Sequence, residues 1–376
     1  MAAGNIAGKI INPDKYYFIF CYQFFQIVKM FNRLFLFLCL SLIVSCKEKD
    51  KQKEQPTKDE KTSELTEKSA CLFSQISYCT NIDSALETYM PGWQLVWEGN
   101  EIGGNHSFLA KKENEYALAI RGSLINFSWA AFQNWIYQDL HVVTQEKWLF
   151  TNDSSKAKLS QGAYDGWQNL CKMTDKKSGK LLLDFLTSEL KEDKSLLITG
   201  HSLGGNLATV FASYLWQVLK NKNHTAPDIN TITFAAPAAG NKAFANDFNY
   251  KFPASIRVEN INDIVPKFPS ASRIASLNLL FSDSLSAGKI EVGYKNMTVS
   301  LSTVFTMLKT ALVLLEYTSG ISPYLQTNGT GKQINIPLSG KNSGNEILNW
   351  LGEAGHQHGI AQYALYEGVP VINCEK

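Results

Sequence analysis

The sequence lacks an excess of charge of either sign. Lys and Arg together number 36, and Asp and Glu number 34, so the 376 residues carry a net charge of only +2. Proteins that bind nucleic acid through its phosphates need a basic surface, so we predict no nucleic-acid partner. The composition, 45% hydrophobic and 19% charged, is that of a globular protein able to bury a sizeable core.

Metal-binding spacings are also absent. The seven cysteines include no CxxC pair and no other zinc spacing. His356 and His358, in GEAGHQHGI, lie two residues apart, but no third ligand with suitable spacing accompanies them. We therefore predict no metal and no cofactor, which leaves one of the two histidines as a candidate general base.

The N-terminal region contains a short apolar run, Leu34–Val44. Leu34–Val44 is shorter than the roughly 20 residues that a membrane span needs. A basic start followed by a short apolar core is typical of a secretory signal, which we place at residues 30–45. Residues 1–29 are then an extension upstream of the true start, unless Tyr16–Val28 and the next run form a membrane hairpin.

Two features after this apolar run predict the localisation of the protein. Ile43-Val44-Ser45-Cys46 resembles the bacterial lipobox, in which the cysteine is lipidated and becomes the mature N-terminus. Residues 46–69 are charged and have almost nothing to bury, so we expect a disordered tether. Its charges resemble the surface-export signals of some Gram-negative lipoproteins. We expect an exported outer-membrane lipoprotein held to the membrane through Cys46, the alternative being a secreted protein.

An even number of cysteines follows Cys46, namely Cys71, Cys79, Cys171 and Cys374. The short loop in CLFSQISYC predicts a disulfide between Cys71 and Cys79. Four free, buried thiols are the alternative.

Residues 70–376 are expected to form one domain without repeats. Strands are expected at 93–99, 105–113, 116–120, 195–199, 229–234 and 256–260, and helices at 180–190 and 206–219. Strands that alternate with helices predict an α/β fold with a mainly parallel sheet covered on both faces. A further apolar helix, Val304–Tyr317, is either a cap over the site or part of the core.

The sequence Gly200-His201-Ser202-Leu203-Gly204 is a G-x-S-x-G motif between a predicted strand and a predicted helix. This is the setting of a nucleophile elbow, in which a sharp turn lifts the serine hydroxyl above the sheet. We predict that Ser202 is the nucleophile and that His201 packs rather than reacts.

A serine nucleophile needs a base, and the base needs an orienting acid. In this class of fold they follow the serine in the order acid, then histidine. Asp263 lies just after a predicted strand, in VENINDIVPKFP, and is the candidate acid. His356 and His358 both come later and could complete a triad with Ser202.

The nucleophile motif, the acid strand and several sequence blocks around them occur in an order that resembles the class 3 lipases, the fungal-type lipase family of the α/β hydrolases. The resemblance runs from about Glu115 to Tyr366 and includes AIRGS, NWIYQDL, GHSLGG, TFAAPAAGNKAFANDF and NINDIVPKFP. HGIAQYALY resembles the H-x-x-x-x-Y of the bacterial branch, which implies that His358 is the base and His356 a loop residue. LSQGAYDGW lacks the histidine of the family's V-H-x-G-F block, a histidine that we interpret as structural.

The resemblance implies further site residues. Ser123 and the backbone N–H of Leu203 would form the oxyanion hole, in which each donor typically contributes about 3 kcal/mol. A short apolar lid is expected within 124–138, a stretch without charge, and its acyl-binding residues would be Leu124, Ile125, Phe127, Trp129 and Trp135. An ordinary core helix is the alternative for this stretch.

The predicted reaction is hydrolysis of the acyl esters of glycerolipids, of the triacylglycerol type, at a lipid interface and through an acyl-enzyme. The same triad would serve a phospholipase A1, a carboxylesterase or a transacylase. A non-catalytic surface lipoprotein that binds lipid or a partner is an alternative of another class. The motifs make no prediction about an oligomeric state.

Overall fold

The computed structural model describes most of the chain after residue 62. The described residues are 63–124, 144–152, 156–222, 227–281, 285–294, 297–318, 320, 322–329 and 331–374, all within one compact unit, Thr62–Lys376. The predicted signal peptide, Cys46 and most of the tether lie outside the described residues. The same is true of four expected lid residues, Ile125, Phe127, Trp129 and Trp135.

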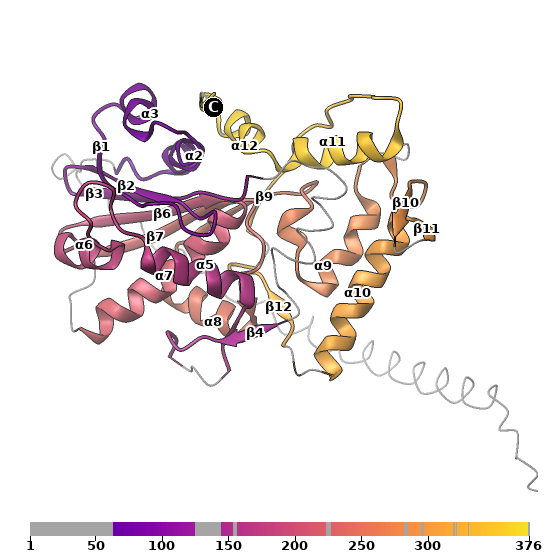
Figure 1. Ribbon diagram of the computed structural model, residues 1–376, viewed down its shortest axis with the longest axis horizontal. Coiled ribbons are helices and arrows are strands. Elements are labelled where there is room, and N and C mark those ends of the chain that lie inside the picture. The colour runs from indigo at the N-terminus through magenta and orange to yellow at the C-terminus, as the bar shows by residue number, and fades with distance from the viewer. Residues whose placement is uncertain are drawn as a thin grey trace, which may run out of the picture. The chain divides into compact units, whose positions relative to one another are not determined.

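A seven-stranded sheet forms the centre of this unit (Figure 1). In spatial order its strands are β1 (Gln94–Glu98), β2 (Ser107–Lys112), β3 (Glu115–Ile120), β6 (Ser195–His201), β7 (Asp228–Phe234), β9 (Ile256–Asn260) and β13 (Lys332–Ile334). The first three pair antiparallel, and the others join β3 and one another in parallel. The expected mainly parallel sheet is confirmed. β13 is too short for hydrophobic periodicity to reveal it.

Helices cover both faces of the sheet (Figure 1). On one face lie α2 (Glu67–Ile76), α3 (Ile82–Tyr89) and α12 (Ile360–Glu367), and on the other α5 (Gln161–Lys172), α6 (Leu182–Glu189), α7 (Leu203–Asn221) and α8 (Lys242–Lys251). Successive side chains of a strand point to opposite faces. Ala117 and Ala119 of β3 are therefore buried on the α2 side, and Leu118 and Ile120 on the α7 side.

A second group of elements lies between β9 and α12 in the sequence. It contains η2 (Val265–Lys267), α9 (Ala271–Ile274), η3 (Ala275–Leu279), the hairpin β10 (Glu291–Tyr294) and β11 (Met297–Ser300), α10 (Leu301–Thr318) and α11 (Glu346–His358). A small sheet has the order β12 (Tyr324–Leu325), β8 (Gly240–Asn241), β5 (Lys158–Ser160) and β4 (Gln145–Lys147).

The apolar helix expected at 304–317 corresponds to α10. Its buried face, including Phe305 and Leu308, packs with Trp350 of α11 and with Val265 after β9. Within the described part of the chain, α10 is also the one helix whose length and apolar composition would suit a membrane span, with 28% of that window buried. The inner face of α10 thus helps to form a core beside the strand that leads to Asp263.

The folded unit begins earlier than expected, because α2 starts at Glu67, inside the predicted disordered tether. The hydroxyl of Thr66 accepts a hydrogen bond from the N–H of Ser69, and the hydroxyl of Ser69 accepts one from the N–H of Thr66. This reciprocal capping box satisfies N–H groups at the start of the helix. The predicted end of the tether at residue 69 is therefore wrong.

The predicted disulfide between Cys71 and Cys79 is also wrong. Cys79 is bonded to Cys374, with their Cα atoms 4.7 Å apart, and Cys71 is a free, buried thiol. Cys71 lies in α2 with its side chain in the core, whereas Cys79 lies beyond the end of that helix. The helical rise of about 1.5 Å per residue carries the chain away from Cys71 before it reaches Cys79. The second free cysteine of the described residues, Cys171, is half-buried.

The disulfide joins two cysteines that are separated by 295 positions in the sequence. Such a cross-link restricts the unfolded chain, so we expect the double variant Cys79→Ser/Cys374→Ser to lower the free energy of unfolding by about 2–5 kcal/mol. Urea unfolding under oxidising conditions measures this value, with Cys171→Ser as the matched control that keeps the disulfide. Equal stability of the double variant and the control would contradict the expectation.

Candidate active site

Ser202 occupies the turn between β6 and α7. Its φ of 59° and ψ of −128° lie in a region that residues other than glycine avoid, at a typical cost of about 1–3 kcal/mol. The flanking glycines permit this turn. A Cβ on Gly200 would lie 2.4 Å from the carbonyl carbon of Gly204, and one on Gly204 would lie 2.1 Å from the carbonyl oxygen of Ile120. The G-x-S-x-G motif therefore folds into a sharp elbow with β3, β6 and α7 in close contact.

Three residues predicted from the sequence meet at this elbow. Nε2 of His358 lies 2.9 Å from Oγ of Ser202, and Nδ1 of His358 lies 2.9 Å from Oδ2 of Asp263. The serine hydroxyl donates to Nε2 when the imidazole carries its proton on Nδ1, and Nδ1–H donates to the carboxylate. All three side chains are buried, so the two hydrogen bonds form in a site shielded from water.

Two further hydrogen bonds hold the carboxylate of Asp263. The hydroxyl of Tyr363 donates to Oδ2 at 2.9 Å, and the N–H of Val265 donates to Oδ1 at 2.9 Å. Burial and the nearby Asp263 raise the pKa of Tyr363, so its hydroxyl keeps its proton and remains a donor. The sequence shows this tyrosine in the H-x-x-x-x-Y pattern but not its contact with the acid, because that contact requires α12 to pack beside β9.

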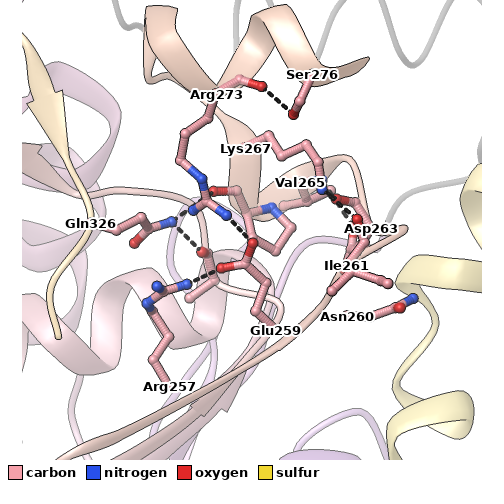
Figure 2. A network of polar contacts seen from close by, with 12 residues as sticks. Arg257, Glu259, Asn260, Ile261, Asp263, Val265, Lys267, Arg273, Ser276 and Gln326 are labelled. Atoms are coloured by element: carbon pink, nitrogen blue, oxygen red, sulfur yellow. Dashed lines mark hydrogen bonds and ion pairs between the residues drawn. The ribbon is translucent and has the colours of Figure 1, made fainter. Parts of the chain in front are cut away.

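A buried ionic network surrounds the strand that leads to Asp263 (Figure 2). Figure 2 shows Glu259 of β9 between Arg257 and Arg273, and its carboxylate forms ion pairs with both. Burial alone would raise the pKa of Glu259, but the two arginines outweigh it and lower this pKa. Nζ of Lys267 donates to two main-chain oxygens of the same turn, including that of Asp263 at 2.9 Å. No motif in the sequence indicates this network.

The two histidines of GEAGHQHGI lie in the last turn of α11. Two residues along a helix correspond to a rotation of about 200°, so their side chains leave on opposite sides. Nε2 of His356 lies 3.3 Å from the carbonyl oxygen of Pro337, whereas His358 reaches Ser202. The prediction that His356 is a loop residue is wrong, because α11 continues through both histidines.

The predicted oxyanion donors border the nucleophile. Ser123 follows Gly122 after β3, and a Cβ on Gly122 would lie 3.2 Å from Cβ of Ser202. Leu203 is the first residue of α7, where helical N–H groups have no acceptor within the helix. Leu124, the one expected lid residue that the structure describes, is 74% exposed.

His201, predicted to pack, is buried beside the base. Its ring centroid lies 4.7 Å from that of His358. Burial and the nearby His358 hold the pKa of His201 well below its usual value, so His201 stays neutral. Within the described ranges, no group of three His, Cys, Asp or Glu side chains is arranged to hold a metal ion.

These features define a class of protein. A strained serine on a strand–turn–helix elbow, with a histidine against its hydroxyl and a buried aspartate behind the histidine, is the constellation of a serine hydrolase with the α/β-hydrolase fold.

Part of the chain resembles a known protein family. Residues 117–273 match the family model described as "Lipase (class 3)". This segment contains the oxyanion turn, Ser202 and Asp263 but ends before His358. Over this segment the chain is similar to the class 3 lipases, and the protein is a serine ester hydrolase.

Solved structures resemble this chain to different degrees. The crystal structure of M37 lipase is 24% identical to this chain, with a TM-score of 0.64, and the match covers 82% of this chain and 95% of that one. The Rhizomucor miehei triacylglyceride lipase is 20% identical, with coverage of 55% and 74% and a TM-score of 0.42. The lipase from Rhizopus microsporus var. chinensis is 21% identical, with coverage of 56% and 71% and a TM-score of 0.43. The likeness to M37 lipase confirms the α/β-hydrolase fold.

The geometry predicts unequal roles for the two histidines. His358→Ala removes the group that accepts the proton of Ser202, so we expect kcat on a soluble ester to fall by at least about 10⁴-fold. His356→Ala removes a contact on the far side of α11, and we expect a change below about twofold. Steady-state rates of both variants, with circular dichroism to show that each is folded, make the comparison. Equal losses would contradict the assignment.

Proposed function

We propose that this protein hydrolyses the acyl esters of glycerolipids, of the triacylglycerol type, at a lipid surface. The observation that carries the proposal is the continuous hydrogen-bonded chain from Ser202 through His358 to Asp263, on an elbow within the class 3 lipase segment. The uncharged stretch 124–138, which adjoins the oxyanion turn, supports an apolar acyl substrate.

The mechanism follows from the positions of these side chains. His358 takes the proton of Ser202 as the serine oxygen attacks the ester carbonyl, and Asp263 stabilises the imidazolium that forms. The main-chain N–H groups of Ser123 and Leu203 would bind the negative oxygen of the tetrahedral intermediate. His358 then protonates the departing alcohol, and an acyl-enzyme remains on Ser202. The same imidazole deprotonates a water molecule, which releases the fatty acid.

A product profile tests both the chemistry and the substrate class. Purified protein is incubated with mixed triacylglycerols, phospholipids and soluble esters, and the products are identified by mass spectrometry. We expect fatty acid and diacylglycerol from triacylglycerol, and a loss of about six orders of magnitude in Ser202→Ala, which removes the nucleophile. Lysophospholipid as the main product would favour a phospholipase A1, and turnover of soluble esters alone would favour a carboxylesterase. Undiminished turnover by Ser202→Ala would overturn the proposed mechanism.

We also propose that the protein is exported and anchored to the outer membrane through lipid on Cys46. The lipobox-like Ile43-Val44-Ser45-Cys46 supports lipidation at this residue. The Cys79–Cys374 disulfide supports export, because disulfides persist in oxidising compartments.

Cell fractionation tests the anchor. We expect the full chain to sediment with membranes and its mature N-terminus to be an acylated Cys46, detected by mass spectrometry of the N-terminal peptide. Cys46→Ala removes the acceptor of the lipid, so this variant should move to the soluble fraction or remain unprocessed. A mature N-terminus at any other residue would contradict the proposal.

A further inference from the structure

The imidazole of His201, next to the nucleophile, has a hydrogen-bond partner at each ring nitrogen. Nε2 lies 2.7 Å from the main-chain oxygen of His358, and Nδ1 lies 3.0 Å from the hydroxyl of Tyr78. A carbonyl oxygen can only accept, so Nε2 carries the proton and Nδ1 accepts from the Tyr78 hydroxyl. The two contacts therefore select one tautomer of His201.

The carbonyl that His201 binds belongs to the catalytic base itself. His358 is the last residue of α11, and the final carbonyls of a helix have no partner within it. His201 supplies a donor for this buried oxygen. The residue beside the nucleophile thus holds the main chain of the base, independently of the triad contact between Ser202 and His358.

Tyr78 extends this chain of contacts to the oxyanion turn. The Tyr78 hydroxyl oxygen lies against Gly122 of that turn. A Cβ on Gly122 would lie 2.3 Å from the same oxygen, so the contact leaves no room for a larger residue. Tyr78 and His201 therefore connect the turn after β3, the elbow after β6 and the end of α11.

Both members of the pair remain neutral. Burial raises the pKa of Tyr78, and burial and His358 lower the pKa of His201. His201 consequently does not compete with His358 for the proton of Ser202, and each hydrogen bond keeps its direction at neutral pH.

Contacts of the residues next to Tyr78 hold this tyrosine in position. It lies in the turn after α2, directly before Cys79, whose disulfide partner is Cys374. Gln75 of α2 also bonds to the C-terminal segment, donating to the carbonyl oxygen of Pro370 at 3.1 Å and accepting from the N–H of Ile372 at 2.9 Å.

We propose that Tyr78 and His201 are positioning residues. They hold the base His358 and the oxyanion turn at Gly122 in the positions that catalysis at Ser202 requires. The proposal rests on the proposed function, since it needs Ser202 and His358 to act as nucleophile and base. Neither residue touches the reacting atoms.

Tyr78→Phe removes the hydroxyl and keeps the ring. We expect kcat on a soluble ester and the rate of Ser202 labelling by a fluorophosphonate to fall together by about tenfold, with KM changed by less than about twofold. Tyr116→Phe is the matched control, because it removes a hydroxyl that donates to Glu189 at 3.0 Å, near the opposite end of β3. The control should leave kcat and the labelling rate unchanged. A Tyr78→Phe enzyme with unchanged kcat, or one that loses only thermal stability, overturns the proposal.

A pair of substitutions at His201 gives the second measurement. The amide of His201→Gln can donate to the His358 carbonyl and accept from Tyr78, whereas His201→Leu can do neither. We expect the glutamine variant to retain several times the kcat of the leucine variant, with both assayed below their melting temperatures. Equal kcat values in the two variants would overturn the proposal. Activity that survives Ser202→Ala would instead overturn the proposed function, so the two failures are distinguishable.

Discussion

The close approach of β6 and α7 at Gly200 and Gly204 is the constraint on which the site depends. Neither glycine leaves space for a Cβ, and the short turn between them forces Ser202 into its positive φ. The N–H of Ser202 donates to the carbonyl oxygen of Phe234 at 2.9 Å, which ties the strained turn to the neighbouring strand. Parallel strands end at the same edge of a sheet, so the turns after β3, β6 and β9 meet there and bring Gly122, Ser202 and Asp263 together.

Burial of this edge means that its polar groups must be paired, since an unpaired buried charge is costly. Asp263 has His358, Tyr363 and a main-chain N–H, and Glu259 has two arginines. Such pairs are weak evidence for stability, because the ions first lose their hydration. Their consequence here is geometric, because they fix the orientation of the carboxylate that orients the base.

Local motifs predicted most of the sheet and the elbow. The strands around β6 either alternate apolar and polar residues or are continuously apolar, and the G-x-S-x-G motif needs only five adjacent residues. Both can therefore be recognised within a short stretch of sequence. Prediction failed where the answer depended on contacts between distant segments. Cys79 pairs with Cys374 rather than with Cys71, because α2 buries Cys71 while the C-terminal segment returns to the end of that helix. The network of Arg257, Glu259 and Arg273 has no local signature for the same reason.

The sequence by itself determined the α/β architecture and predicted the nucleophile and the chain order of the triad, because hydrophobic periodicity and the elbow are properties of neighbouring residues. The tertiary structure decided how those parts act together. It placed His358 against Ser202 and turned His356 away, through the rotation of one helix. It also brought Tyr363 to Asp263, and Tyr78 to His201. These contacts join residues about 100 or more positions apart, and only packing of the helices onto the sheet brings such residues within hydrogen-bond distance.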